Sequence, residues 1–253
     1  MNKKTIAIIG TNGLPSKYGG WEQLINNLTA KLGKEFNFIV YTGKTPLSKQ
    51  IKKYNDAEIR YVGLNPNGFE SIFYDFLSMI DAVNKSKIYF VCGVSGAIFF
   101  PIFRLLNKKI ILNPDGIEWK RNKFSLPAKI FLFISETIGL FFSSKIISDN
   151  NKIKEHIQRK YNIKSNLIEY GGDHVISNIN LSHKILKKHG IKKNNYAFKV
   201  CRIEPENNVE LILNVFSSLN IKFVIIGNWD NSSYGKNLKK KYSNYNNIII
   251  LDP

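Results

Sequence analysis

Cysteine is scarce in this sequence, and histidine lacks metal-ligand spacing. The two cysteines, Cys92 and Cys201, lie far apart in apolar, strand-like runs, so they form no disulfide framework and no metal-binding pair. Zinc-ligand spacing is also absent from the four histidines, at positions 156, 174, 183 and 189. The sequence therefore predicts no metal site, and its cysteine usage is typical of a reducing cytoplasm.

Long hydrophobic runs are also lacking. The longest, residues 130–142 (IFLFISETIGLFF), is too short to span a bilayer and is interrupted by Glu136. It predicts a buried helix first and a helix on a membrane surface second, because aromatic residues fill it and Lys123, Lys129 and Lys145 flank it. The N-terminus, MNKK, leads directly into a strand-like run rather than a signal peptide. We expect a cytoplasmic protein, with peripheral contact at the inner face of the cytoplasmic membrane as an open possibility.

Acidic residues are the minority among the charged side chains. The chain has 37 Lys and Arg against 19 Asp and Glu, which gives a net charge of +18. A charge of this sign attracts anionic lipid, nucleic acid and phosphorylated substrates. The sequence is also crowded with Lys, Asn and Ile, a bias that an AT-rich genome produces by itself. Because no nucleic-acid-binding motif accompanies the charge, we expect no nucleic-acid partner.

Short apolar runs alternate with segments of helical periodicity along most of the chain. Two of the helical segments are residues 69–83 and 94–107, and the strand-like runs are KTIAIIG, FNFIVYTG, AEIRYVG, KIYFVCG, KKIILNP and KIISD. This alternation predicts an α/β fold in which helices cover both faces of a parallel sheet. Ligands in such folds gather at the carboxyl ends of the strands. The loops of interest are therefore those at residues 10–20, 93–96, 113–121 and 170–174.

A second unit is expected after residue 174. Residues 175–195 are polar and rich in lysine, and a strand–helix–strand pattern then resumes with YAFKVCR, NVELILNVFSSL and IKFVIIG. The chain stops shortly after one further helix and one further strand, NNIIILDP. So few elements make a thin core. We predict one complete Rossmann-like domain at residues 1–174 and an incomplete second Rossmann-like domain at residues 175–253.

The stretch GTNGLPSKYGGWE, residues 10–22, joins the first strand to the first helix. Gly19 and Gly20 lie at the turn into that helix, where missing side chains let another molecule approach the backbone. Free amides at a helix N-terminus bind anionic groups, so the loop predicts a phosphate site. A tight turn that binds nothing is the alternative. The glycine spacing does not match a dinucleotide fingerprint, and the chain has no P-loop motif.

Two further loops place charged side chains at the ends of strands. In the loop at residues 113–121, Asp115 or Glu118 can orient or deprotonate a sugar hydroxyl, and Trp119 can stack on a sugar face. A Pro-Asp-Gly turn before a charged helix start explains the same residues without a ligand. In the second unit, Arg202 can hold a diphosphate, or it can merely precede a helix whose first turn contains Glu206.

Four of these segments occur together in the order and with the separations of one enzyme family. GTNGLPSKYGGWE, DGIEWKRNKFS, IEYGGDH and RIEPENN resemble segments of the retaining glycosyltransferases of family 4, which have the two-domain GT-B fold. More narrowly, they resemble the bacterial rhamnosyltransferases that build capsule, O-antigen and exopolysaccharide repeats. The resemblance covers essentially the whole chain, and the first and last blocks are its most specific parts.

The resemblance implies a donor site built from both domains. Gly19, Gly20 and Arg202 would meet the phosphates of the donor, and Glu206 and Asn207 would open the helix next to them. Family members usually have a lysine at the position of Asn207, so this chain would hold the diphosphate with one cation fewer.

The resemblance also implies catalytic and acceptor-side residues. Asp115 and Glu118 would be the catalytic residues near the reacting sugar. The acceptor side would include Tyr18, Trp21, Glu22 and Trp119.

The implied activity is transfer of rhamnose or another hexose from a nucleoside-diphosphate sugar to a lipid-linked saccharide. The configuration would be retained, and no metal or other cofactor would be needed. Family members continue well past Pro253 into a region that binds the donor, so the chain alone is expected to bind its donor weakly and to transfer little. A non-catalytic module that binds a glycan or a partner is the alternative. A sugar-nucleotide epimerase is disfavoured, because a nicotinamide fingerprint is lacking.

Overall fold

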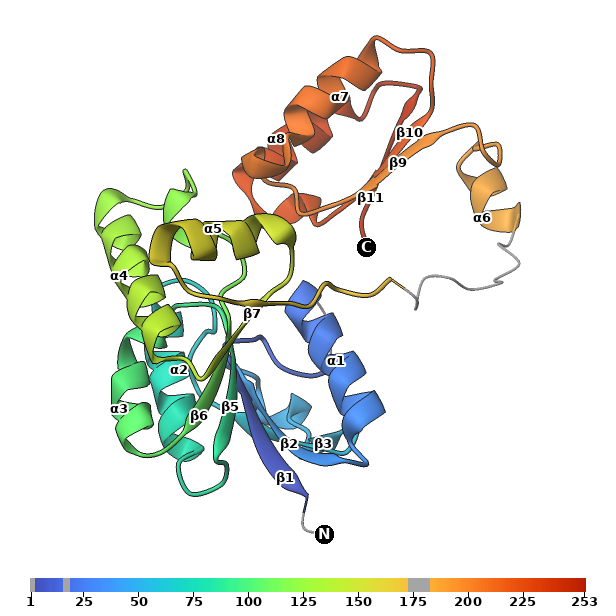
Figure 1. The fold of residues 1–253 in the computed structure, drawn as a ribbon. Helices are drawn as coiled ribbons and strands as arrows, with labels where there is room; N and C mark the ends of the chain where they lie inside the picture. Colours follow the sequence, from blue (N-terminus) through green and yellow to red (C-terminus); the bar gives the residue numbers. More distant parts are fainter. Residues whose placement is uncertain (1–2, 16–18, 173–182) are drawn as a thin grey trace. The chain divides into compact units, whose positions relative to one another are not determined.

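The computed structural model describes residues 3–15, 19–172 and 183–253. The chain divides into two compact units, Met1–Asp173 (unit 1) and His174–Pro253 (unit 2), which are drawn in Figure 1. Each unit has its own parallel or mostly parallel sheet and its own hydrophobic core. The predicted α/β class is therefore confirmed.

Unit 1 is built on an eight-stranded sheet in the order β3-β4-β2-β1-β5-β6-β7-β8. Every strand pair is parallel except β3–β4. The strands are β1 (Lys4–Ile9), β2 (Phe36–Thr42), β3 (Lys53–Tyr54), β4 (Ala57–Tyr61), β5 (Ile88–Cys92), β6 (Lys109–Asn113), β7 (Lys145–Ser148) and β8 (Asn166–Leu167). The six predicted strands are confirmed. The analysis missed β3 and β8, because two-residue strands are too short to show periodicity.

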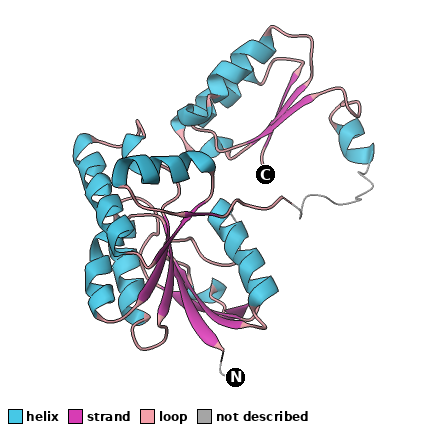
Figure 2. Cartoon of the chain, in the orientation of Figure 1, coloured by secondary structure: helices cyan, strands magenta, loops and turns pink. Residues whose placement is uncertain are grey.

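Helices cover both faces of this sheet (Figure 2). On one face lies α1 (Gly20–Leu32), where Ile25 packs with the strand residues Ile8 and Val40. The alternate strand residues, such as Ala7 and Ile9, belong to a second core, because successive side chains of a strand point to opposite faces. That second core is covered by α2 (Glu70–Asp81), α3 (Phe100–Leu105), α4 (Leu126–Phe142) and α5 (Asn151–Tyr161), with short 3-10 turns at η2 (Ala97–Phe99) and η3 (Glu118–Lys120). A further 3-10 turn, η1 (Leu47–Lys49), follows β2.

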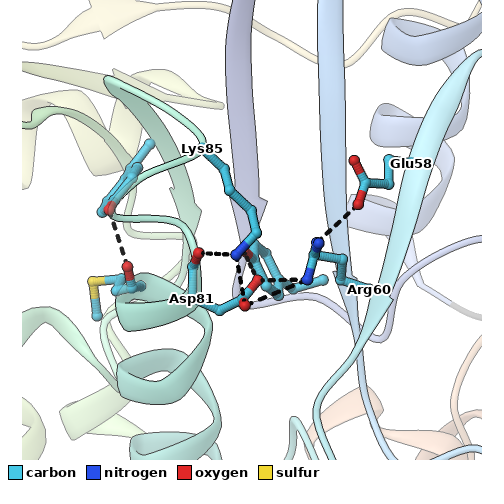
Figure 3. Close-up of polar contacts among 7 residues, drawn as sticks. Glu58, Arg60, Asp81 and Lys85 are labelled. Carbon is cyan, nitrogen blue, oxygen red and sulfur yellow. Dashed lines mark hydrogen bonds and ion pairs between the residues drawn. The ribbon is translucent and has the colours of Figure 1, made fainter.

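The C-terminal end of α2 is fixed to the sheet by polar contacts, shown in Figure 3. Asp81 accepts a hydrogen bond from the Tyr41 hydroxyl at 2.7 Å and pairs with Lys85 at 2.8 Å and with Arg60 at 3.2 Å. Arg60 also pairs with Glu58 on its own strand, at 2.8 Å. Burial works against the charge of Asp81, but Lys85, Tyr41 and Arg60 together lower the pKa of this carboxyl. The network therefore favours the ionised form of Asp81.

Helix α4, which corresponds to the longest apolar run, is only half buried. It buries Ser135, Glu136, Gly139 and Leu140 against the sheet side. Its other side is open to solvent: Leu126 is 71% exposed and Ile130 is 52% exposed. The leading expectation of a buried helix therefore holds for one face only, because the other side of α4 does not meet the core. Among the helices of the described residues, none is long and apolar enough to cross a membrane.

Unit 2 has a three-stranded parallel sheet in the order β11-β10-β9. Its elements are α6 (His183–Lys188), β9 (Ala197–Val200), η5 (Pro205–Asn207), α7 (Val209–Ser217), β10 (Phe223–Ile226), η6 (Trp229–Asn231), α8 (Ser233–Tyr242) and β11 (Ile248–Leu251). One sheet face packs against α7 and α8 around the buried ring of Trp229. On the edge strand β9, Phe198 is 57% exposed and Val200 is 64% exposed. The unit is thus a small Rossmann-like layer in which α7 and α8 pack on one face of the sheet.

Candidate functional site

The loops after β1 and β5 begin at a switch point of the unit 1 sheet. These two strands are neighbours, but the chain leaves β1 for β2 on the opposite side. Loops that diverge from adjacent strands in this way form the usual ligand crevice of open α/β sheets. Gly10 has a φ of 88°, and a Cβ atom there would lie 2.0 Å from the carbonyl oxygen of Cys92. The two loops therefore start in direct backbone contact, which only glycine permits at this position.

A buried carboxylate organises the glycine turn before α1. Glu22 accepts hydrogen bonds from the backbone amide of Asn12 at 2.8 Å and from its side-chain amide at 3.1 Å. Gly19 has a φ of 97°, and a Cβ atom there would lie 2.3 Å from Glu22 Oε2, whereas Gly20 has open space around it. The turn thus leaves room beside Gly20, but a negative charge already lies next to Gly19. The sequence predicted phosphate contacts for both glycines, and these contacts remain a prediction.

Trp21 lies against the loop after β5. Its ring is near Gly93, where a Cβ atom would approach the ring to 3.1 Å. Its Nε1 is buried and has no hydrogen-bond partner. Buried indole N–H groups normally find a partner, so Trp21 provides a free donor at this edge of the sheet. Tyr18, the other aromatic residue predicted for the acceptor side, lies outside the described residues.

Asp75 is a candidate site residue that the sequence pattern did not single out. It is 2% exposed on α2, and its Oδ2 accepts a hydrogen bond from the amide of Gly96 at 2.9 Å. Its Oδ1 is buried without a partner. Burial raises the pKa of this carboxyl to about 8, and the Gly96 hydrogen bond opposes that rise only partly. Asp75 is therefore mainly protonated at neutral pH, and its Oδ1 can donate a hydrogen bond.

Tyr74, beside Asp75, connects the same helix to the loop after β1. Its hydroxyl donates to the carbonyl oxygen of Thr11 at 3.0 Å. Helix α2 thus holds the loop after β1 through Tyr74 and the loop after β5 through Asp75. The signal in the sequence was the polar pair Tyr74–Asp75 within the apolar segment FESIFYDFLSMIDAV, which periodicity alone assigns to a core-facing helix.

The loop after β6 places Asp115 in a strained and crowded position. Asp115 has a φ of 64°, and its amide donates to Asn113 Oδ1 at 3.1 Å. The side-chain amide of Asn113 donates in turn to the Tyr170 hydroxyl at 3.4 Å. Burial, followed by the charges of Glu118 and Asp149, raises the pKa of Asp115. Left-handed backbone at a residue other than glycine is common at functional sites, and a raised pKa suits a proton acceptor.

Glu118 and Trp119 follow Asp115 but have neighbours of their own. Glu118 pairs with Arg121 at 2.9 Å. Trp119 donates from Nε1 to Glu136 of α4 at 3.2 Å and packs edge-to-face on Phe133, with ring centroids 5.5 Å apart. The structure therefore places the indole of Trp119 against α4.

Three acidic side chains affect the thiol of Cys92 at the end of β5 through their charge. Burial raises the pKa of this thiol, and three acidic side chains add to the rise: Glu22, Asp75 and Asp115. They come from α1, α2 and the loop after β6, which are far apart in the sequence. The carboxyl edge of the unit 1 sheet is thus rich in acidic side chains in a chain of net charge +18, although Asp75 itself is mainly protonated at neutral pH. Such a site suits hydrogen bonding to hydroxyl groups better than it suits direct contact with phosphate.

In unit 2, the predicted diphosphate residues lie between β9 and α7. Arg202 is exposed, and its guanidinium is 3.8 Å from the Glu204 carboxylate. Asn207 donates from its side chain to the carbonyl oxygen of Arg202 at 2.8 Å, which fixes the turn. Glu206 lies in η5 between them and is exposed. An exposed guanidinium at a strand end can turn to an anion, although Glu204 competes for it here.

The described residues contain no cluster of three or more His, Cys, Asp or Glu side chains arranged to hold a metal ion.

Residues 3–173 match the model of a family described as a domain of unknown function, DUF1972. The chain belongs to the DUF1972 family. That match includes the whole carboxyl edge of unit 1, from Gly10 to Tyr170, whereas Arg202, Glu206 and Asn207 lie beyond it. No curated protein matches the sequence.

Solved structures similar to this DUF1972 protein show its fold class. Sucrose-phosphate synthase from Thermosynechococcus elongatus matches with a TM-score of 0.77 at 13% identity, over 99% of this chain and 70% of that one. Anabaena HepE in complex with UDP-glucose matches with a TM-score of 0.69 at 9% identity, over 99% and 69%. A Listeria monocytogenes protein named as a UDP-N-acetylglucosamine 2-epimerase matches with a TM-score of 0.61 at 11% identity, over 100% and 70%.

These matches confirm the GT-B type of fold that the resemblance implied. At such low identities they show the fold alone. The DUF1972 chain spans about 70% of the length of these relatives. Membership of glycosyltransferase family 4 and of its rhamnosyltransferase branch remains a prediction.

Proposed function

We propose that this DUF1972 protein is a glycosyltransferase that uses a nucleoside-diphosphate sugar as its donor. The observation that carries the proposal is the GT-B fold, which matches over 99% of the chain with a sucrose-phosphate synthase and with HepE bound to UDP-glucose. The sequence blocks around Gly19 and Arg202, which resemble retaining glycosyltransferases, support the same function. Rhamnose or another hexose is the proposed sugar, and a lipid-linked saccharide of a bacterial surface polysaccharide is the proposed acceptor.

In the proposed mechanism the two units contribute residues with different roles. In unit 2, Arg202 would stabilise the leaving diphosphate by charge-assisted hydrogen bonds, as developing negative charge requires. In unit 1, the acidic edge would bind sugar hydroxyls, and the raised pKa of Asp115 suits it to accept a proton from the acceptor. No metal or other cofactor is part of this proposal.

The donor-binding role is tested by isothermal titration of UDP-glucose and dTDP-rhamnose into the wild-type chain and Arg202→Ala. Hydrogen bonds to a charged group contribute about 1.5–3 kcal/mol, so the variant should bind roughly 10- to 100-fold more weakly. Lys240→Ala removes the same charge from an exposed position near the end of α8 and should not change the affinity. Equal affinity of Arg202→Ala and wild type would contradict the assignment of Arg202.

Transfer itself is tested by product analysis. Nucleoside diphosphate should be released only when a saccharide acceptor is present, and NMR of the product should show the anomeric configuration of the donor. An inverted product would contradict the retaining mechanism. Binding of an acceptor saccharide without any donor affinity would instead support a non-catalytic binding module.

A sugar-nucleotide epimerase is the second candidate, because the structural match to the Listeria protein favours it. A missing nicotinamide fingerprint does not exclude an enzyme of that fold. An epimerase would convert a UDP-sugar into its isomer without an acceptor, which NMR of the sugar nucleotide detects. Isomer formation in the absence of an acceptor would overturn the transferase proposal in favour of this one.

A further inference from the structure

Helix α2 is apolar on the side that faces solvent as well as on the side that faces the core. Its core side buries Tyr74 and Met79 completely. On its outer side, exposed apolar residues recur at helical spacing and form one stripe, the α2 stripe, which starts at the residue before the helix: Phe69, Phe73, Leu77 and Ile80. A helix that is apolar all round is normally buried on every side, so the stripe indicates a partner.

The apolar surface around the α2 stripe is large enough for a protein interface. Exposed fractions of 45% to 76% on its four large side chains leave roughly 400 Å² of apolar surface. Helix α3 lies beside α2 (Figure 1), because Phe76 of α2 packs edge-to-face on Phe103 of α3 with ring centroids 6.3 Å apart. It exposes three more apolar side chains: Ile102, Leu105 and Leu106. Two copies of this surface would together bury more than the roughly 1,000 Å² that a specific interface requires.

The distribution of charge indicates that the partner is a second copy of this chain. From residue 61 to residue 84 the sequence contains no lysine or arginine, although the whole chain has a net charge of +18. Helices that bind an anionic surface have cations beside their apolar face, and the α2 stripe has none. Two chains of charge +18 repel each other over most of their surfaces. At the α2 stripe, however, they can meet without placing cations against cations.

The two ends of α2 differ in charge, which favours one orientation of the two copies. The exposed Glu70 begins the helix, whereas Lys85 and Lys87 follow its C-terminal end. In an antiparallel pair, the acidic end of each helix lies near the basic end of the other, and the two helix dipoles point in opposite directions. A parallel pair would place like charges together at both ends. The charges therefore favour the antiparallel pair.

We propose that this protein forms a twofold-symmetric homodimer in which the α2 stripes of two copies pack antiparallel. Phe73 then lies opposite the partner's Leu77, and Phe69 lies opposite the partner's Ile80, because both pairs have nearly the same centre along the helix. Such self-complementarity is what a twofold interface requires. Helix α2 begins at the carboxyl edge of the sheet, after β4, so the dimer directs the two carboxyl edges in opposite directions. The proposal goes beyond sugar transfer and does not depend on it.

The interface is tested by light scattering and sedimentation velocity of the full chain over a dilution series at micromolar concentrations. The wild type should have twice the mass of one chain. Phe73→Ser with Leu77→Ser removes two apolar side chains from each copy and should raise the dissociation constant of the dimer by about 100-fold or more. The control, Leu211→Ser with Val215→Ser, removes an exposed apolar pair at the same spacing from α7 of unit 2. It should leave the dimer intact.

Several outcomes of these measurements would overturn the proposal. A monomeric wild type would do so, and so would a dimer that dissociates equally in both variants or in neither. A monomeric chain that binds uncharged phosphatidylcholine vesicles, and loses that binding in Phe73→Ser with Leu77→Ser, would also overturn it, because the stripe would then bind hydrocarbon. Far-UV circular dichroism and melting temperatures establish that each variant is folded.

Disulfide cross-linking tests the antiparallel orientation without disrupting the interface. Phe69→Cys with Ile80→Cys should give a covalent dimer under mild oxidation, on a Cys201→Ser background because Cys201 is partly exposed. Eleven residues of helix separate the two positions by about 16 Å, so neither substitution alone should cross-link two copies. Efficient cross-linking of a single variant, or none in the double variant, would contradict antiparallel packing. These readouts need neither donor nor acceptor, so a failed transferase assay would leave their outcome unaffected.

Discussion

The buried carboxyl of Asp75 should make unit 1 less stable as the pH rises. Its pKa of about 8 in the folded chain compares with an ordinary value of 3.8. Between about pH 4 and pH 8, Asp75 is therefore protonated in the folded state but ionised in the unfolded state. The free energy of unfolding falls as the pH rises through that range. At 1.36 kcal/mol for each pH unit, the full loss is on the order of 5 kcal/mol. Because the side chain is only 2% exposed, solvent screening does little to reduce it.

Asp75→Asn removes this proton while it keeps an oxygen that can accept from the Gly96 amide. The variant should match the wild type near pH 4 and exceed it by several kcal/mol near pH 9. Urea unfolding followed by hydrogen exchange mass spectrometry measures this, because peptides from unit 1 and unit 2 are resolved separately. Glu35→Gln, at an exposed position, is the matched control and should leave the pH profile unchanged. Parallel stability profiles of wild type and Asp75→Asn from pH 5 to pH 9 would refute the reasoning.

Three further predictions concern the fold around the site. Asp81→Asn should lower the stability of unit 1 by about 1 kcal/mol at pH 7. Because the folded pKa of Asp81 is lowered from 3.8, this loss should shrink as the pH falls below that value and through the folded pKa. A loss that is as large at the acid end of a pH series of thermal melts as at pH 7 would argue against the ion pairs. Gly10→Ala should cost about 3 kcal/mol or more, since it combines a positive φ with a backbone clash, while Gly20→Ala should change the melting temperature little. Glu22→Ala should cost about 2 kcal/mol, because it leaves the Asn12 amides unpaired, and Glu22→Gln should recover most of that stability; equal losses would show that hydrogen bonding is not the cause.

The sequence by itself determined the fold class and the loops that matter. Apolar runs of strand length separated by helical periodicity define parallel α/β layers, because each element can bury its apolar side only against the other kind. The predicted strands also place Gly10 and Asp115 in loops that follow the carboxyl ends of strands, where ligands gather in such folds. These statements depend on local patterns, and the structure confirms the strands that carry them.

Only the tertiary structure decided which side chains meet. Asp75 lies within an apolar helical run, and nothing local distinguishes it from a surface carboxylate. Its pKa is raised because the folded chain buries it, and the hydrogen bond from Gly96, which is distant in the sequence, opposes that rise only partly. Trp119 and Asp115 are close in the sequence but have different surroundings in the fold. The indole of Trp119 contacts Glu136 and Lys160, which come from two other helices. Desolvation and charge coupling depend on distances across the fold, and a one-dimensional pattern does not contain those distances.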